Sequence, residues 1–155
     1  MLLDKIEQLV YNTKEMDDEA LQYYTKSKYY YKKFNSEVDI AVIDFNVTNI
    51  SVQQTGKTKT ISLEKRNEAI KVYERVKEIF KKNEEYIYYT KAVYALGVQL
   101  TETDKLQEGL KFYLEAEEIA LLTKDNITLI SIYRSMAENY RKSNIRWLNP
   151  VWWRK

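Results

Sequence analysis

The chain has 155 residues, of which 45% are hydrophobic and 31% are charged, which is enough apolar content for one folded domain with a buried core. Its 25 basic and 23 acidic residues nearly cancel, so nucleic acid is a disfavoured partner, because proteins that bind phosphate backbones are usually strongly basic. The absence of cysteine and histidine excludes a disulfide framework and Ser-His or Cys-His nucleophiles, and it removes the usual ligands of zinc. We therefore expect no metal, no cofactor and no enzymatic activity.

The scarcity of glycine and proline favours a helical fold. Three glycines and one proline are too few turn-forming residues for an all-β sandwich, and charged residues interspersed with apolar ones are typical of amphipathic helices. The N-terminal stretch MLLDKIEQLV is charged by its fourth residue, and no run of about 18 apolar residues occurs, so we expect neither an export signal nor a membrane span. The sequence predicts an all-α, cytoplasmic protein.

The first 34 residues predict a helical hairpin. Apolar residues between positions 2 and 10 mark a short amphipathic helix, and we expect a turn at Met16 to Asp18. A second helix follows from Glu19 to Phe34, with an aspartate before it as a cap for its free amide groups. Asn35 stands where a left-handed residue would end that helix.

The stretch from Val38 to Val52 is the hardest to assign. Its β-branched residues favour a strand, but apolar residues at positions 40, 43, 47 and 50 are spaced as on one helical face, so we predict a helix. Residues 54–63, rich in threonine and lysine, carry no apolar stripe and predict an inserted loop.

Two glycines stand inside the helical patterns of residues 85–124. Glycine in a helix interior is disfavoured by about 1 kcal/mol relative to alanine, so we expect close contact between two helices at Gly97 and Gly109 to offset that cost. The same pair of helices recurs along the chain. Placing Gly109 over Ala69, an offset of 40 (109 minus 69), aligns EGLKFYLEAEEIA with EAIKVYERVKEIF. The same offset places Gly97 over Ala137, and an offset of 49 places Ala69 over Ala20 (69 minus 20).

These copies resemble the tetratricopeptide repeat. The residues that carry the resemblance are Leu96, Gly97, Gly109, Tyr113 and Ala116, then Ala69 and Tyr73, then Ala20 and Tyr24, then Met136, Ala137 and Tyr140. The spacing of 40 exceeds the common period of about 34 residues and is similar to the lengthened bacterial variant found in Rap-type peptide-sensing regulators. The chain departs from the family pattern at Val93, Val76 and Ser27, and its last repeat stops after one helix.

The resemblance implies a right-handed superhelix of about three helical hairpins plus an unpaired last helix, about seven helices in all. One repeat domain would cover residues 1–144, with repeats at about 2–34, 37–82, 85–124 and a half repeat at 127–143, followed by a tail at 145–155. Such a fold implies a non-enzymatic scaffold that binds a peptide or protein segment in its concave groove, as part of a bacterial signalling or regulatory system.

The family's groove positions fall on a mainly basic set of residues in this chain: Lys5, Asn49, Lys91, Tyr94, Arg134, Glu138 and Arg141. We expect them to bind a segment that carries carboxylates, with the arginines as forked donors and Lys91 as a point charge. Asn49 would grip peptide backbone and Tyr94 would supply apolar contact. The alternative is that all of them are solvated surface groups.

The tail carries Trp147, Trp152 and Trp153, and Pro150 must end any helix that reaches it. These tryptophans either fold back over the last helix or contact a second molecule, which makes a homodimer the alternative assembly. On that reading the chain is a dimerising or sensor module, or a fragment of a larger regulator. A minor alternative is an enzyme that uses carboxylates such as those at positions 115, 117 and 118.

Overall fold

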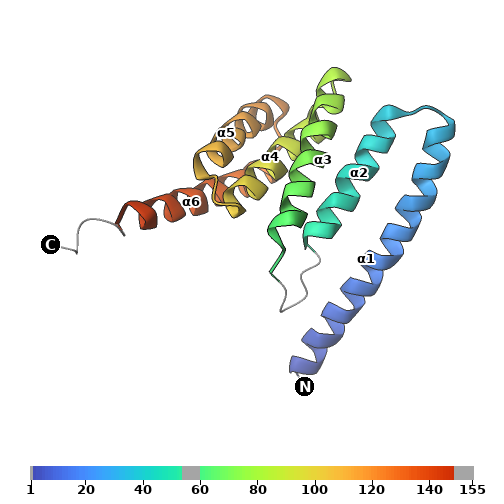
Figure 1. Ribbon diagram of the computed structural model, residues 1–155, viewed down its shortest axis with the longest axis horizontal. Helices are drawn as coiled ribbons and strands as arrows, with labels where there is room; N and C mark the ends of the chain where they lie inside the picture. Colours follow the sequence, from blue (N-terminus) through green and yellow to red (C-terminus); the bar gives the residue numbers. More distant parts are fainter. Residues whose placement is uncertain (1, 54–59, 149–155) are drawn as a thin grey trace. The chain divides into compact units, whose positions relative to one another are not determined.

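The computed structural model describes the backbone of residues 2–53 and 60–148 and the side chains of residues 16–53 and 60–144. Within these ranges the chain is all-α, with six helices and no strand (Figure 1). The helices are α1 (Leu2–Lys33), α2 (Glu37–Gln53), α3 (Leu63–Lys82), α4 (Tyr86–Glu102), α5 (Leu106–Thr123) and α6 (Asn126–Leu148). The predicted all-α class is confirmed. None of the six has the length and apolar content that a lipid bilayer would require of a spanning helix.

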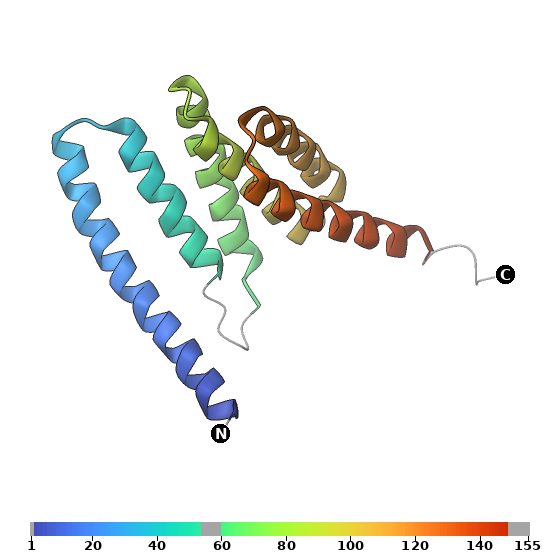
Figure 2. The ribbon, with the colours of Figure 1, turned by 180° about the vertical axis from the view of Figure 1, so that it is seen from behind.

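The chain divides into two compact units, Met1–Val72 and Tyr73–Lys155, and the division falls inside α3. In the first unit α1 packs against α2, and Lys28 of α1 forms an ion pair with Asp44 of α2. In the second unit α5 packs against both α4 and α6 (Figure 2). The core of the second unit is built from large buried side chains: Tyr73, Val76, Phe80, Val93, Leu96, Tyr113 and Ile132. One repeat domain over residues 1–144 stays a prediction.

The N-terminal helix α1 corrects one prediction. We expected a turn at Met16 to Asp18, but α1 is a single helix of 32 residues that runs through these positions. No glycine or proline occurs before residue 35, so no residue in this stretch interrupts the helical hydrogen bonds. An aspartate can cap a helix but does not by itself start one. The described part of the chain therefore has six helices where the sequence predicted about seven.

The ambiguous stretch after α1 is helical, as predicted. It forms α2, and its buried residues are Ala41, Ile43, Phe45, Thr48 and Val52. Of the four residues that the spacing placed on the inner face, only Ile43 is buried, and the others are partly covered. Every residue between positions 38 and 52 is at least partly covered. Because α2 has apolar residues on most of its sides, several faces fit the helical spacing. The spacing alone therefore does not predict which face is most buried.

Four turns in the described ranges end a helix in the same way. Asn35, Glu84, Asp104 and Lys124 all have φ between 51° and 70°. In each turn the following residue donates its backbone N–H to a carbonyl five residues earlier, for example Glu85 to Phe80 at 2.9 Å and Asp125 to Ala120 at 2.9 Å. This is the Schellman arrangement, which satisfies carbonyl groups at a helix end. The predicted helix end at Asn35 is confirmed.

α6 starts at a cap and ends later than predicted. The Asp125 carboxylate accepts hydrogen bonds from the Thr128 backbone N–H at 3.0 Å and from the Thr128 hydroxyl at 2.5 Å, and these bonds lower the pKa of Asp125. The half repeat was expected to stop at residue 143, but α6 continues to Leu148. The sequence offers no glycine or proline between the start of α6 and Pro150, so nothing stops the helix earlier.

The two helical glycines lie where α4 meets α5. A Cβ on Gly109 would stand 2.9 Å from the Gly97 carbonyl oxygen, and a Cβ on Gly97 would stand 2.6 Å from Cε1 of Tyr113. Both glycines have ordinary helical backbone, because no glycine in the described ranges has positive φ. Close approach of the two helices, rather than an unusual conformation, is thus what requires them. The predicted contact between Gly97 and Gly109 is confirmed.

Candidate binding site between helices α4 and α6

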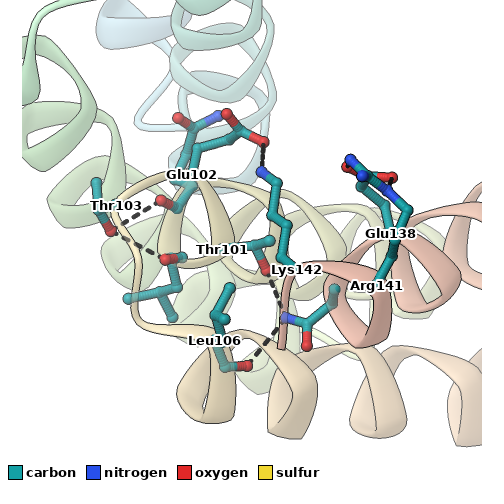
Figure 3. Close-up of polar contacts among 10 residues, drawn as sticks. Thr101, Glu102, Thr103, Leu106, Glu138, Arg141 and Lys142 are labelled. Atoms are coloured by element: carbon teal, nitrogen blue, oxygen red, sulfur yellow. Dashed lines mark hydrogen bonds and ion pairs between the residues drawn. The ribbon is translucent and has the colours of Figure 1, made fainter. Parts of the chain in front are cut away.

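A buried asparagine fixes α6 against the turn between α4 and α5. Asn139 is 1% exposed, and its side-chain amide donates to the Thr101 hydroxyl and to the Leu106 carbonyl, each at 2.9 Å (Figure 3). Closer to the surface, the Lys142 ammonium pairs with the Glu102 carboxylate at 2.9 Å. A buried amide that lost its partners would cost free energy, so this pair of bonds specifies the register of α6.

Two tyrosines, Tyr113 and Tyr94, connect this buried region to the surface between α4 and α6. The Tyr113 ring is buried, and its centroid lies 5.9 Å from that of Tyr94. The Tyr94 hydroxyl shares a hydrogen bond of 2.9 Å with the hydroxyl of Ser135 on α6. Burial raises the pKa of Tyr113, while its hydrogen bonds with Thr101 and Ser135 oppose that rise. Tyr94 is therefore held by contact with the tilted Tyr113 ring and by a hydrogen bond with Ser135 of α6.

An open hollow lies above this network, between α4 and α6. It is lined by Tyr94, Ser131, Arg134, Ser135 and Glu138. The four residues from α6 stand at positions 131, 134, 135 and 138, so the pairs three or four positions apart place them on one face of the helix. The hollow measures about 470 Å³, within the range of about 300–1,000 Å³ that is usual for ligand sites. Its lining is more polar than that of most small-molecule pockets, which suits a hydrogen-bonding chain better than an apolar compound.

The two arginines of α6 whose side chains are described, Arg134 and Arg141, differ in which groups they can still bind. The Arg141 guanidinium donates two hydrogen bonds to the Glu138 carboxylate, one of them at 2.9 Å (Figure 3). These bonds hold the pKa of Glu138 below its usual value. Arg134 is exposed and has no hydrogen bond or ion pair with any described residue. The fork of Arg134 is thus open at the rim of the hollow, whereas the fork of Arg141 is occupied.

The structure brings together three of the seven predicted groove residues, namely Tyr94, Arg134 and Glu138. Arg141 borders them through Glu138. Lys91 is exposed on α4, but it does not line the hollow: its ammonium lies 5.5 Å from the centre of the Tyr88 ring. A second group of predicted residues lies elsewhere or is not described.

Asn49 lies on α2 in the first unit, where it is partly covered and has an interaction partner. The side chains of Lys5, Trp147, Trp152 and Trp153 lie outside the described residues. Their predicted roles in the groove and in a second contact stay predictions.

Sequence reasoning missed two kinds of residue at this site. Ser131 and Ser135 line the hollow, and their spacing of three or four from Arg134 and Glu138 could have placed them on the same face. Asn139 was missed because it stands among apolar neighbours on the inner face of α6. A polar residue at such a position is a detectable signal, since buried amides are almost always hydrogen-bonded.

Within the described side chains, no group of three or more aspartates or glutamates is placed to hold a metal ion. Four described tyrosines have a raised pKa. Burial is the main cause for Tyr73, Tyr89 and Tyr113, and a hydrogen bond with Glu117 is the main cause for Tyr133. A raised pKa keeps a phenol protonated at neutral pH, so none of the four is prepared to act as a base or nucleophile.

Comparison with known proteins assigns no family to this chain. No protein-family model matches it, and no curated protein is significantly similar to it. What the hollow between α4 and α6 binds is therefore inferred from its own residues.

Proposed function

We propose that this chain is a non-catalytic scaffold of the tetratricopeptide type, which binds a carboxylate-bearing segment of a peptide or protein in the hollow between α4 and α6. The role would belong to a regulatory system, as the resemblance to peptide-sensing repeat proteins implies. The observation that carries the proposal is the open guanidinium of Arg134 beside a tyrosine that is held in place by two neighbours.

The arrangement of the helices supports the repeat on which this proposal rests. The left-handed residues Asn35, Glu84 and Lys124 are separated by 49 and 40 positions (84 minus 35, and 124 minus 84). These are the same offsets at which the sequence copies align. The close contact between Gly97 and Gly109 also agrees with the small residues that such repeats use between their two helices.

The chemistry of Arg134 supports a carboxylate as the group that is bound. A guanidinium offers several N–H donors in a plane, and a carboxylate can accept two of them at once. Arg134, exposed and without a partner among the described side chains, keeps this capacity for a ligand. Tyr94, held by Ser135, offers one face of its ring to an apolar part of the same segment.

Glu138 limits how a ligand can lie in the hollow. Its carboxylate would repel a second carboxylate nearby, although Arg141 neutralises much of its charge. The acidic group of a ligand is therefore expected on the Arg134 side. Peptide N–H groups of the ligand can donate hydrogen bonds to the remaining acceptor positions of Glu138 and to the hydroxyl oxygens of Ser131 and Ser135. This pattern favours an extended peptide with one acidic side chain or a free C-terminal carboxylate.

The test is to measure binding of an array of unstructured decapeptides, which differ only in the number and position of carboxylates, to the intact chain and its variants. Arg134→Ala should weaken binding of acidic peptides about tenfold or more, because hydrogen bonds to charged groups contribute about 1.5–3 kcal/mol. Arg134→Lys should recover part of that loss, since lysine keeps the positive charge but lacks the paired N–H donors of the guanidinium. Lys111→Ala, an exposed cation of α5 outside the hollow, is the matched control. Equal affinity of the parent chain and Arg134→Ala would remove this site from consideration.

A shortened chain separates the hollow from the tryptophan tail. A version that ends at Asn144 keeps every residue that lines the hollow. Acidic peptides should bind it as they bind the intact chain. Loss of binding on removal of residues 145–155 would instead favour the tail as the contact.

A further inference from the structure

α6 carries an apolar stripe that is largely exposed in the described part of the chain, although the hydroxyl of its Tyr133 hydrogen-bonds with Glu117 of α5. Its members are Ile130, Tyr133, Ala137 and Tyr140, spaced three, four and three positions apart. This spacing follows the helical repeat, so the four side chains lie on one face. Ile130 is 63% exposed, Tyr133 47% and Tyr140 51%, and Ala137 is also exposed. A contiguous exposed patch of this kind is typical of an interaction surface.

The same positions on α4 show what covers such a stripe. At an offset of 40 (130 minus 90) stand Thr90, Val93, Gly97 and Leu100, and all four are buried. α5 packs on this helix, and it does so antiparallel, since Gly97 near the end of α4 meets Gly109 near the start of α5. The stripe on α6 is therefore a surface prepared for an antiparallel helix with the pattern of α5.

α1 has that pattern and leaves part of it open. The open stripe consists of Met16, Ala20, Tyr23, Ser27 and Tyr30, again at helical spacing. Ala20 corresponds to Gly109 at an offset of 89 (109 minus 20), but Gly109 is buried and Ala20 is only partly covered. Tyr23 is 68% exposed and Tyr30 59%. α6 thus exposes the face that α4 buries. On α1, the exposed Tyr23 and Tyr30 flank Ala20 and Ser27, which correspond to the buried Gly109 and Ala116 of α5 and are only partly covered.

The charges at the ends of the two stripes are complementary in the antiparallel orientation. Residues 17–19 of α1 are all acidic, and they would lie beside Arg141 and Lys142 near the end of α6, which also form ion pairs with Glu138 and Glu102. Residues 32–33 at the other end of α1 are both basic, and they would lie toward Asp125 at the start of α6. A parallel orientation would instead place like charges together, which disfavours it.

We propose that two copies of this chain associate head to tail, with the α6 stripe of one copy packed antiparallel on the α1 stripe of the next. The contact joins two different surfaces, so it is heterologous. It leaves one free α1 stripe and one free α6 stripe at the ends of a pair. Further copies can add there until the concentration or a ring closure stops growth. This self-association uses a different face of α6 from the peptide hollow.

The test begins with the molar mass of the intact chain, measured by light scattering over a wide range of concentrations. The mass should rise from that of one chain through that of two and beyond. Ala137→Glu should block the α6 stripe, and Tyr23→Glu should block the α1 stripe, because each places a charge in the centre of an apolar contact. Each variant alone should therefore keep the mass of one chain.

Mixing the two blocked variants is the decisive step. The free α1 stripe of Ala137→Glu and the free α6 stripe of Tyr23→Glu should form a pair of two chains that grows no further. Leu122→Glu places the same charge on α5 at a residue that is 79% exposed and outside both stripes, and it should associate like the parent chain. Circular dichroism should show equal helix content in all three variants, since each changed residue is exposed.

Three outcomes would overturn the proposal. The intact chain could keep the mass of one chain at every concentration. Either blocked variant could still associate by itself. The mixture could also fail to form pairs although the parent chain associates, which would show that the α1 and α6 stripes do not bind each other.

Discussion

α4 and α6 carry related residue patterns at an offset of 40, and they differ in what covers them. Leu100 of α4 is 4% exposed, whereas Tyr140 at the matching position of α6 is 51% exposed. The difference does not come from local helix preference, because both stretches are helical over their full length. It comes from α5, which packs on the face of α4 that remains open on α6. A pattern of apolar residues therefore identifies a face that can be buried, and the neighbouring helix decides whether it is.

The largest effect on stability should distinguish the covered stripe of α4 from the open stripe of α6. Leu100→Ala removes a buried side chain and should lower the free energy of unfolding by about 3 kcal/mol, within the range of about 2–5 for such changes. Tyr140→Ala at the matching open position should cost less than about 1 kcal/mol, as most surface changes do. Urea unfolding at a concentration where the chain is monomeric measures both. Similar losses would mean that the α6 stripe is covered in solution.

The second effect concerns the side of α6 that is covered. Asn139→Ala should lower the free energy of unfolding by about 2 kcal/mol, because the Thr101 hydroxyl and the Leu106 carbonyl lose their donor in a buried place. Asn144→Ala, at an exposed position of the same helix, is the control and should change stability little. Urea unfolding again gives the values. A loss at Asn139 no larger than at Asn144 would argue against the buried hydrogen bonds.

The third effect reverses the usual preference for alanine in a helix. Gly97→Ala should destabilise the chain by about 1–2 kcal/mol, since the cost of overpacking against the buried Tyr113 ring exceeds the gain of about 1 from helix propensity. At the matching position of α6 the exposed Ala137 has room, so Ala137→Gly should cost about 1 kcal/mol through propensity alone. Thermal unfolding of the two variants checks the signs. A stabilised Gly97→Ala would show that α4 and α5 are not in close contact there.

The smallest effect on stability is expected at the N-terminal caps of α6 and α4. Asp125→Ala should cost about 1 kcal/mol at neutral pH, because the cap of α6 is lost. Glu85, the matching residue before α4, makes no side-chain cap bond, so Glu85→Ala should change little.

The pH dependence of this cap follows from the lowered pKa of Asp125. A carboxylate with a folded-state pKa below its unfolded value of 3.8 stabilises the fold above that value. The stabilisation is lost as the pH falls through the lower, folded-state pKa. The difference between the parent chain and Asp125→Ala should therefore be constant near neutral pH and shrink in strong acid. A difference that persists in strong acid would contradict the role of the charged carboxylate.

Local pattern and internal comparison were enough to predict that the described part is all helical. For α2 the offset between copies outweighed the β-branched residues, and the helix is there. The choice of its inner face was wrong for Val47 and others, because a helix with apolar residues on most sides offers several faces to its neighbours. The turn within α1 was wrong because Asp17 and Asp18 can either cap a helix or continue one. Which of the two happens depends on contacts that are distant in the sequence.

At the candidate site, the groove positions implied by the resemblance included Tyr94 and Arg134, and both residues line the hollow between α4 and α6. What the sequence analysis did not foresee was how the charges pair within it. Arg141 and Glu138 are three residues apart on one helix, and they bind each other. Competition of this kind decides which of several arginines stays available, and it depends on side-chain conformations that a pattern of positions does not contain.

The distribution of glycine has a consequence for engineering a more heat-resistant form of the protein. In the described ranges, glycine stands only inside helices, while the four left-handed turn residues are asparagine, glutamate, aspartate and lysine. Residues with a Cβ pay a conformational penalty in that region that glycine does not. Substitution by glycine at these turn positions is therefore the change expected to raise the unfolding temperature. The core offers less room for improvement, because α4 and α5 already fit closely.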